Sequence, residues 1–437
     1  MGAALNLLLE QVDFVTAFMN GDLEEDVFMK QILGYEYPGR PNHVCKLKKV
    51  LNGILQAPRQ WFAKLFDALL ELGFTASKHD PTVFFRGENR GLIIVVVFVD
   101  DLLVAAKEQK ELNSFKEALA ARFEIKDLGP VTTYLGIDIY RDTKGRVLYM
   151  SQEAYVNKLL KRFGMEDAHT RDIPIEVGHA LTNPSGPNGD PVECEYPQLV
   201  GALMYLMVCT RPDIAYAISV LCRYMAKGRH TSTHWKAAKR VLQYLKKTKG
   251  LSLVLGGDDA LKLEVYADAA WADDQEQRKS TLGFRAAIGK GLVSWKAKLS
   301  DCVALSSAEA EYYAAGEGVK EGLWLAGLLG ELGWEVLPFR LLMDSHSAIC
   351  MVKNPVINAR SKHIEVKHHF VRDGHEAKKF TLEDVPSADN LADCFTKALP
   401  GERLRGQLTE NLRNVPAHLK GLEAGARMAE AGEPAHE

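Results

Sequence analysis

The chain has 437 residues, 47% hydrophobic and 25% charged, with a formal net charge of −3. This is globular composition with room for two or three domains, and the near-neutral balance does not indicate any class of partner. The seven cysteines include no CxxC pair, which argues against a zinc ribbon or disulfide framework and suits a reducing compartment. The first residues lack a basic segment followed by a long apolar core, so no signal peptide is expected.

Residues 1–150 mix strand and helix patterns. Segments 82–87 and 92–99 are rich in β-branched and aromatic residues and predict two strands, while 10–18 predicts a strand that runs into a turn. Apolar residues at helical spacing predict helices over 59–74 and 109–123, and 132–151 predicts a hairpin. The apolar run 91–106 is shorter than the roughly 20 residues of a membrane span and contains two acids, so no span is expected.

Residues 151–250 are predicted to be mostly helical, apart from a loop rich in Pro, Gly and Asn over 179–197. Between Cys222 and Gly250 there are nine Lys or Arg and no Asp or Glu. These cations predict either a solvated helix face or contact with a phosphate backbone. The backbone candidates are Arg223, Lys236, Lys239, Arg240 and Lys246.

From about residue 256 strands alternate with helices, which predicts a mixed sheet with helices on its faces. Strands are expected over 261–271, within 280–298 on either side of Gly289–Gly291, over 340–344 and over 378–386. Helices are expected over 306–333, with Ser306 or Ser307 as N-cap and Gly333 as stop, over 345–354 and over 390–399. The polar residues 401–437 are expected to form a frayed or disordered tail.

Two acids interrupt the apolar stretch "VVVFVDDLLVAA", where isolated carboxylates would be costly. If Asp100 and Asp101 lie in a tight turn at a strand end, one of them can meet Asp13, at the end of another strand. Carboxylates at adjacent strand ends form a hard oxygen site suited to Mg²⁺. The alternative is a surface turn with two exposed acids, since Asp is common in turns.

The C-terminal region repeats this pattern. Asp268 and Asp344 follow strands, Glu311 lies one turn into a helix, and Asp393 lies in the first turn of the last predicted helix. Four such acids at one sheet edge would suit two-metal phosphoryl transfer. For Glu309, one turn earlier, stabilisation of the helix N-terminus is the preferred interpretation.

Several motifs occur together in order and form a specific signature. They include "QVDFVTAFMNGDLEEDVFM", "VVFVDDLLVAA", "FEIKDLGPVTTYLGIDIYRD", "GALMYLMVCTRPDIAYA", "YADAAWADDQEQRKSTLGF" and "ALSSAEAEYYAA". Over roughly residues 10–400 the chain resembles the reverse transcriptase and ribonuclease H portion of a copia-type retrotransposon polyprotein. The resemblance implies an α+β and α/β multidomain protein. It would have a palm-type (ferredoxin-like) polymerase domain over 1–150, a helical thumb and connection over 151–255, a ribonuclease H-like domain over 256–400 and the polar tail over 401–437.

The resemblance also implies roles for single residues. Asp13, Asp100 and Asp101 match the polymerase carboxylates, and Asp268, Glu311, Asp344 and Asp393 match those of the ribonuclease H, each set holding two Mg²⁺ or Mn²⁺. Phe18 matches the residue that blocks a ribose 2′-hydroxyl, although a core phenylalanine is the alternative. The remaining matches are to the template and nucleotide pocket, Gly53, Gln56 and Pro58, and to the primer-grip hairpin, Leu135 and Gly136.

The implied partners are an RNA template, a DNA primer, an RNA–DNA hybrid and deoxynucleotide triphosphates, and the implied location is a cytoplasmic particle or the nucleus. Only twelve residues precede Asp13, so most of the family's fingers, with the cations that bind the triphosphate, are missing, and little or no DNA synthesis is expected. His363, His368 and His369 lack cysteine partners and are expected to be structural or to contact the hybrid. The alternatives are a non-catalytic nucleic-acid-binding remnant and a fragment that does not fold stably.

Overall fold

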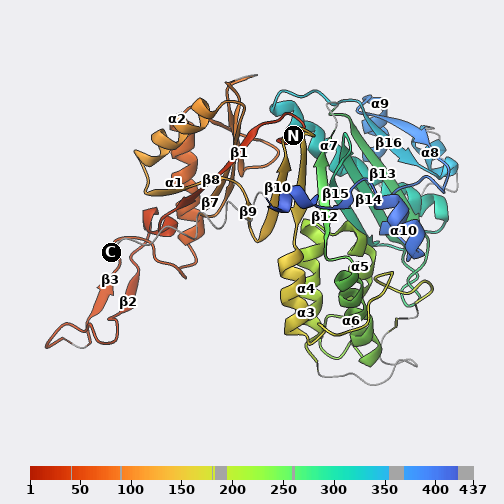
Figure 1. Cartoon of the computed structure of the whole chain (residues 1–437), viewed down its shortest axis with the longest axis horizontal. Coiled ribbons are helices and arrows are strands. Elements are labelled where there is room, and N and C mark those ends of the chain that lie inside the picture. The colour runs from red at the N-terminus through yellow and green to blue at the C-terminus, as the bar shows by residue number, and fades with distance from the viewer. Residues whose placement is uncertain are drawn as a thin grey trace.

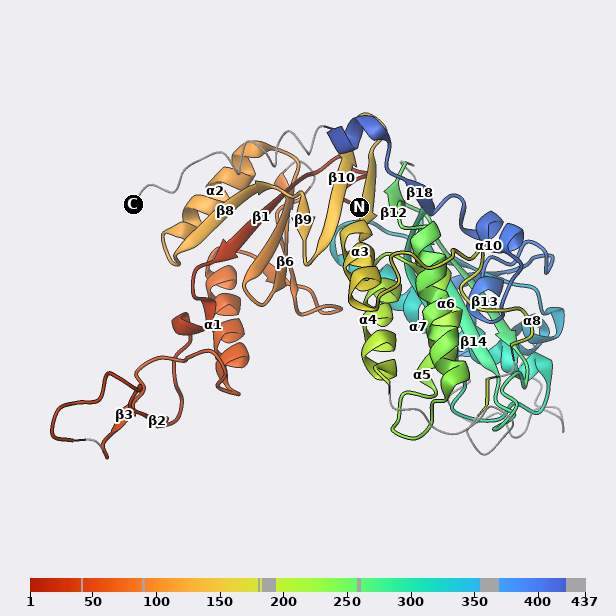
Figure 2. The same ribbon diagram turned by 60° about the horizontal axis from the view of Figure 1, so that its bottom comes forward.

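The computed structural model describes residues 1–40, 42–88, 91–179, 181–182, 194–257, 261–353 and 369–421. A five-stranded sheet lies between an N-terminal six-stranded sheet and a C-terminal five-stranded sheet, and a group of helices packs below it (Figure 1). Figure 2 shows these helices, α3 to α6, beside the C-terminal sheet. Within the described ranges no helix is both long and apolar enough to cross a membrane.

The N-terminal sheet has the strand order β4-β5-β6-β7-β1-β8. Its β-branched strands alternate between two faces, and the face that holds Val12, Val95 and Val104 is buried under two helices. The strands are β1 Leu8–Phe14, β4 Thr75–Ala76, β5 Val83–Arg86, β6 Ile93–Phe98, β7 Asp101–Ala106 and β8 Ile125–Pro130, and the helices are α1 Ala57–Glu71 and α2 Gln109–Ala120. Between β1 and α1 lie the 3-10 helix η1 Ala17–Asn20 and an arm formed by β2 Phe28–Lys30 and β3 Val44–Lys46 (Figure 1).

The middle sheet joins distant parts of the chain in the order β18-β12-β11-β10-β9. The predicted hairpin over 132–151 is present, and two further strands extend it. The strands are β9 Thr133–Tyr134, β10 Ile137–Asp142, β11 Val147–Ser151, β12 Leu251–Gly256 and β18 Leu412–Asn414.

The expectation of a polar tail from residue 401 is wrong for residues 401–421. Helix α10 Gly401–Leu408 leads into β18, which pairs with β12. Leu404, Leu408 and Leu412 are buried in one apolar cluster. The segment is polar overall, but three of its leucines recur at every fourth position. Their burial stabilises the segment.

The helices predicted between residues 151 and 250 are present, and they enclose an apolar core of their own. They are α3 Glu153–Arg162, α4 Tyr196–Cys209, η3 Pro212–Ile214, α5 Ala215–Cys222 and α6 Ser232–Lys247. Arg211 is buried beneath them, 2% exposed, and its guanidinium forms a two-point ion pair with Asp213 over 2.9 and 2.6 Å. The Tyr244 hydroxyl donates to the same carboxylate at 2.7 Å.

The C-terminal sheet has the order β15-β14-β13-β16-β17, antiparallel over β15, β14 and β13 and parallel over β13, β16 and β17. Its strands are β13 Leu263–Ala270, β14 Thr281–Ile288, β15 Gly291–Leu299, β16 Phe339–Met343 and β17 Phe380–Asp384, and its helices are α7 Ser307–Glu331, α8 His346–Lys353 and α9 His369–Glu376. Helix α7 packs closely on the sheet because Gly318 and Gly322 leave room for Val265 and the Phe339 ring. The predicted helix over 390–399 is wrong in extent: only the 3-10 turn η5 Asp393–Phe395 forms.

Helix α7 also connects the C-terminal unit to the N-terminal sheet. Its Glu331 carboxylate accepts hydrogen bonds from the Ser77 hydroxyl at 2.5 Å and from the Lys78 backbone N–H, and it lies 3.2 Å from His79 Nδ1. The indole of Trp324 donates to the His79 carbonyl at 2.8 Å. Apolar contacts of Leu328 and Leu332 with the N-terminal sheet complete this interface.

Two glycines of α7 offer a matched test of this interface. A Cβ at Gly327 would lie 2.0 Å from His79 Nε2, whereas a Cβ at Gly330 would meet nothing within 4 Å. Alanine normally stabilises a helix interior by roughly 0.5–1 kcal/mol relative to glycine. We therefore expect Gly330→Ala to raise the urea midpoint and Gly327→Ala to lower it and to speed proteolysis between the two units. Equal effects of the two substitutions would argue that His79 does not pack against α7.

Candidate active sites

Three carboxylates converge at one edge of the C-terminal sheet. Asp268 lies near the end of β13 and Asp344 directly follows β16; these strands are parallel neighbours, so their carboxyl ends meet at the same edge. Glu311 reaches the same point from the start of α7, whose N-cap is Ser306. One oxygen from each carboxylate lies within 4.8 Å of the other two. Among the described residues this is the single group of acids, histidines or cysteines that meets this distance criterion.

Burial and mutual repulsion dominate the electrostatics of this group. Burial raises the pKa of Glu311 to about 9, and the charges of Asp268 and Asp344 contribute to the rise. Burial also raises the pKa of Asp268 to about 6, although the Lys397 charge and the Thr396 hydroxyl oppose the shift. Without a cation, at least one proton therefore stays in the group near neutral pH. Such a dry, negative, oxygen-only site fits a hard divalent ion such as Mg²⁺ or Mn²⁺.

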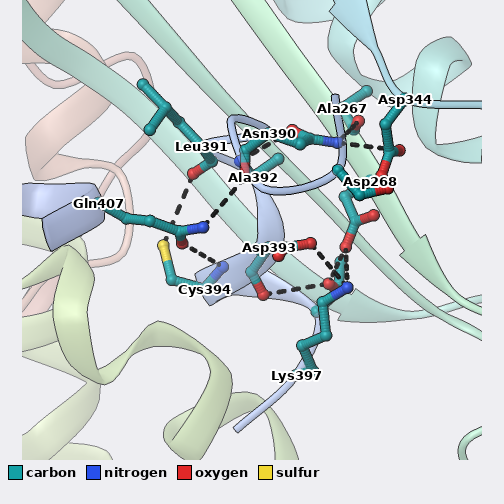
Figure 3. Close-up of polar contacts among 12 residues, drawn as sticks. Ala267, Asp268, Asp344, Asn390, Leu391, Ala392, Asp393, Cys394, Lys397 and Gln407 are labelled. Carbon is teal, nitrogen blue, oxygen red and sulfur yellow. Dashed lines mark hydrogen bonds and ion pairs between the residues drawn. The ribbon is translucent and has the colours of Figure 1, made fainter. Parts of the chain in front are cut away.

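Polar side chains from the segment after β17 hold two of the carboxylates in place (Figure 3). The Asn390 side-chain amide donates to Asp344 at 3.2 Å and to the Ala267 carbonyl at 3.0 Å. The Thr396 hydroxyl donates to Asp268, and the Ser387 hydroxyl donates to Asp344. Sequence patterns did not single out these residues, because Asn, Thr and Ser are common in loops for many reasons.

The fourth predicted carboxylate, Asp393, lies next to this group but is not part of it. Its side chain is fully buried and forms ion pairs with Lys397, at 2.6 Å, and with Arg403 of α10. Figure 3 shows Lys397 between Asp393 and Asp268. Asp393 and Lys397 stand four positions apart and form an i,i+4 acid–base pair, a sequence signal that could have indicated this contact.

In the N-terminal sheet the acids occupy the β6–β7 turn and the neighbouring strand. Phe98 pairs with Asp101 across the turn, and Asp101 pairs with Asp13 of β1. Val99 has a φ of 56°, an unfavourable value for a β-branched residue. The Trp61 indole donates to the Val99 carbonyl at 2.6 Å, and the Phe14 N–H donates to the Asp100 carbonyl at 3.0 Å. These bonds fix the strained turn against α1 and β1.

Asp13 and Asp101 point to the same face of the sheet, because paired residues on adjacent strands do so. Burial raises the pKa of Asp13, followed by the charges of Asp100 and Asp101. The Gln11 amide donates to Asp101 at 2.9 Å, and Lys126 of β8 is the register partner of Asp13. Asp100 is exposed, so of the two acids in the turn only Asp101 is partly covered.

The sequence model of a reverse transcriptase (RNA-dependent DNA polymerase) family matches residues 1–177. The chain is 39% identical over 407 residues to the retrovirus-related Pol polyprotein from transposon TNT 1-94 of Nicotiana tabacum, covering 92% of this chain and 30% of that protein. It is 36% identical to the corresponding polyprotein from transposon RE2 of Arabidopsis thaliana, covering 90% and 26%. It is 30% identical to the transposon Ty5-1 protein of Saccharomyces cerevisiae over 71% of this chain and 100% of that protein.

The chain belongs to the copia-type retrotransposon Pol family and has a reverse transcriptase-like and a ribonuclease H-like domain. It spans less than a third of the length of the plant polyproteins. Among solved structures, the foamy viral protease-reverse transcriptase in complex with an RNA/DNA hybrid aligns with a TM-score of 0.52, at 15% identity over 90% of this chain and 46% of that one. The same viral protein in complex with double-stranded DNA aligns with a TM-score of 0.51, at 12% identity over 86% and 56%. The predicted fold class, a palm-type domain, a helical thumb and connection and a ribonuclease H-like mixed sheet with flanking helices, is confirmed.

The residues that the copia-type resemblance assigned to the nucleotide and template pocket and to the primer grip lie in three separate places. Phe18 is partly buried against the palm core, so the structure fits both interpretations of this residue. Gly53 has a φ of 93° in an exposed turn, Gln56 is the N-cap of α1, and Pro58 lies in its first turn. Leu135 and Gly136 form the left-handed β9–β10 turn, with φ values of 48° and 75°, and the Tyr205 hydroxyl donates to the Leu135 carbonyl.

Tyr134, immediately before that turn, was not singled out by the sequence. Burial and the charge of Asp101 raise the pKa of its hydroxyl to about 12. The negative charge of Asp101 therefore acts on the side chain that immediately precedes the turn.

Three of the five basic residues proposed to contact a nucleic-acid backbone already have protein partners. Arg223 pairs with Asp274 at 2.9 Å, Arg240 pairs with Glu176 at 2.7 Å, and Lys246 donates to the Ala168 carbonyl at 2.9 Å. Lys239 lies over the Trp235 ring, 4.9 Å from its centroid, and Lys236 is exposed. The structure therefore favours Lys236 and Lys239 as the accessible cations of α6 among these five.

The remaining residues that the sequence singled out are Glu309 and three histidines. Glu309 is buried, its carboxylate accepts from the Leu305 N–H at 2.7 Å and from the Tyr313 hydroxyl, and its own N–H donates to Ser306. It therefore closes the N-terminus of α7, in line with the helix-terminus interpretation. His363, His368 and the side chain of His369 lie outside the described residues.

Proposed function

We propose that the chain cleaves the RNA strand of an RNA–DNA hybrid at the Asp268–Glu311–Asp344 centre, with Mg²⁺ or Mn²⁺ as cofactor. The observation that supports this most strongly is the convergence of three carboxylates from β13, α7 and the end of β16 within 4.8 Å. Membership of the copia-type family and the overall fold add to that support.

The protein residues would hold and orient the reacting groups. Asp268, Glu311 and Asp344 supply the ligand oxygens, and Thr396, Ser387 and Asn390 keep two of these carboxylates in position. Divalent ions bound there would lower the pKa of a water and stabilise the charge on the scissile phosphate. Burial of Asp268 and Glu311 strengthens these electrostatic effects, because water screens buried charges less.

We further propose that the palm face with Asp13 and Asp101 is the DNA polymerase centre, with a template, a primer and deoxynucleotide triphosphates as partners. The support is weaker here: these acids share a face with Lys126, but the described acids of this face do not form a group as compact as that of the ribonuclease H-like domain. We therefore expect cleavage to be readily measurable and DNA synthesis to be weak or absent.

A hybrid-cleavage assay with the purified full chain tests the main proposal. We expect Mg²⁺-dependent release of RNA fragments from a labelled hybrid, loss of that release in Asp268→Asn, and no cleavage of the matching RNA duplex. A primer-extension assay on the same preparation tests the polymerase proposal. Salt-dependent hybrid binding with no cleavage in either protein would instead favour a binding remnant.

A further inference from the structure

Lys397 places a permanent positive charge inside the ribonuclease H-like centre. Its ammonium lies 2.6 Å from Asp393 Oδ1 and 3.7 Å from Asp268 Oδ2. The side chain is 45% exposed, so its stem reaches the centre from the surface. Figure 3 shows the ammonium between the two carboxylates.

The two oxygens of Asp393 are both engaged. Lys397 pairs with one oxygen and Arg403 with the other, and the side chain of Asp393 has no exposed surface. Asp268, Glu311 and Asp344 lack an equivalent pair of cations and form the compact group described above. The four acids of the centre are therefore divided into an open group of three and one acid that is already neutralised.

We propose that Lys397 is a positioning residue that sets the order of metal loading. The first divalent ion enters the open group of Asp268, Glu311 and Asp344. A second ion, which would need an oxygen of Asp268 together with one of Asp393, has to displace the Lys397 ammonium. This inference rests on the function proposed above and adds to it a side chain, Lys397, that competes with the second metal ion.

The chemistry of the side chain explains the competition. An ammonium offers three donors and no acceptor, so it cannot itself bind a metal ion. Two cations a few ångströms apart repel strongly in a partly buried site. The flexible stem lets the ammonium move toward water, while Arg403 would remain as the partner of Asp393. Displacement is therefore feasible but weakens the binding of the second ion.

Counting Mn²⁺ ions by calorimetry tests the proposal directly. All proteins carry Asp13→Asn, Asp100→Asn and Asp101→Asn, so that the palm acids do not contribute. We expect one tight and one weak Mn²⁺ per centre in the parent, and at least about tenfold tighter binding of the second ion in Lys397→Met. Lys397→Arg keeps the charge and should resemble the parent. Lys296→Met is the matched control, because Lys296 has a similar exposure of 46% and pairs with Glu317 outside the centre.

A second measurement uses the unsubstituted lysine, so it does not depend on the folding of a variant. Acylation of Lys397 by an amine-reactive ester, read by mass spectrometry, should stay low at Mn²⁺ concentrations that fill the first site and rise as the second fills. Acylation of Lys296 should stay constant throughout this titration. A flat response of Lys397, or equal second-ion affinities in the parent and Lys397→Met, would overturn the inference and leave the proposed function intact. If Glu311→Gln binds as much Mn²⁺ as the parent, the proposed centre itself is wrong.

Discussion

Glu311→Gln is expected to abolish hybrid cleavage and, at the same time, to stabilise the metal-free protein. The glutamine keeps the shape of the side chain but cannot carry the charge that a metal ligand needs. Metal binding supplies several kcal/mol to such reactions, and each 1.36 kcal/mol is a factor of ten in rate. We therefore expect a loss of at least about 10³-fold in hybrid cleavage.

The gain in stability follows from the raised pKa of Glu311. Its pKa is about 9 in the folded protein against an ordinary value of 4.5, so between these two pH values the unfolded chain releases a proton that the folded protein retains. Stability is therefore lost as the pH rises through this window. Glutamine removes the loss, and at pH 8 the metal-free variant should melt about 2–4 °C or more above the parent.

Calorimetric melts at pH 4.5 and pH 8, with and without Mn²⁺, measure this effect. The difference should nearly vanish at pH 4.5, where the carboxyl is protonated in the folded protein and already half protonated in the unfolded chain. Mn²⁺ should raise the melting temperature of the parent more than that of the variant, because the ion binds the folded centre. A variant that melts below the parent at pH 8 without metal would show that Glu311 is held by partners that favour its charged form.

Arg211→Met should destabilise the folded protein strongly. The guanidinium and Asp213 are each 2% exposed, and the carboxylate also accepts from Tyr244. Methionine fills much of the volume but leaves Asp213 buried without a cation. Removal of one partner from such a pair typically costs 3–5 kcal/mol. Hydrogen exchange should accelerate in α5 and α6, and the urea midpoint should fall.

Two comparisons isolate the charge effect at this pair. Arg211→Met with Asp213→Leu removes both charges and should recover much of the loss, because an apolar pair can replace a buried ion pair. Lys64→Met breaks the exposed pair with Asp22 and should cost about 1 kcal/mol or less. If the double substitution is as unstable as the single one, packing rather than charge explains the effect.

Much of the fold could be predicted because local patterns coincide with the final elements. The Ser306 cap and the Gly333 stop bracket α7, and a β-branched run marks β6. Strand β18 could not be predicted in this way, since three residues, Leu412–Asn414, form a strand only because β12 offers a free edge. The turn η5 is short for a similar reason: Asn390 and Gln407 bind the backbone around it in place of helical bonds.

The acids of the candidate site could be predicted from the sequence, but of its two cations only Lys397 left a sequence signal. Asp268 and Asp344 follow strands, so the strand order alone brings them together once β13 and β16 are neighbours. The position of Arg403 depends on α10, which lies in the segment expected to be a tail. Because that helix was not predicted, the pairing of Asp393 with Arg403 could not be foreseen, whereas the i,i+4 spacing did signal its pairing with Lys397.

The single helix α7 carries Glu311 near one end and the contacts with the palm near the other. An α-helix turns by about 100° and rises 1.5 Å per residue. Inserting one residue between Glu311 and Trp324 would therefore rotate every palm-facing side chain away from the loop of Ser77 and His79, even though no contact residue had changed. Natural length variation in this family should thus be rare between these two positions and should fall instead in the segments that flank the helix.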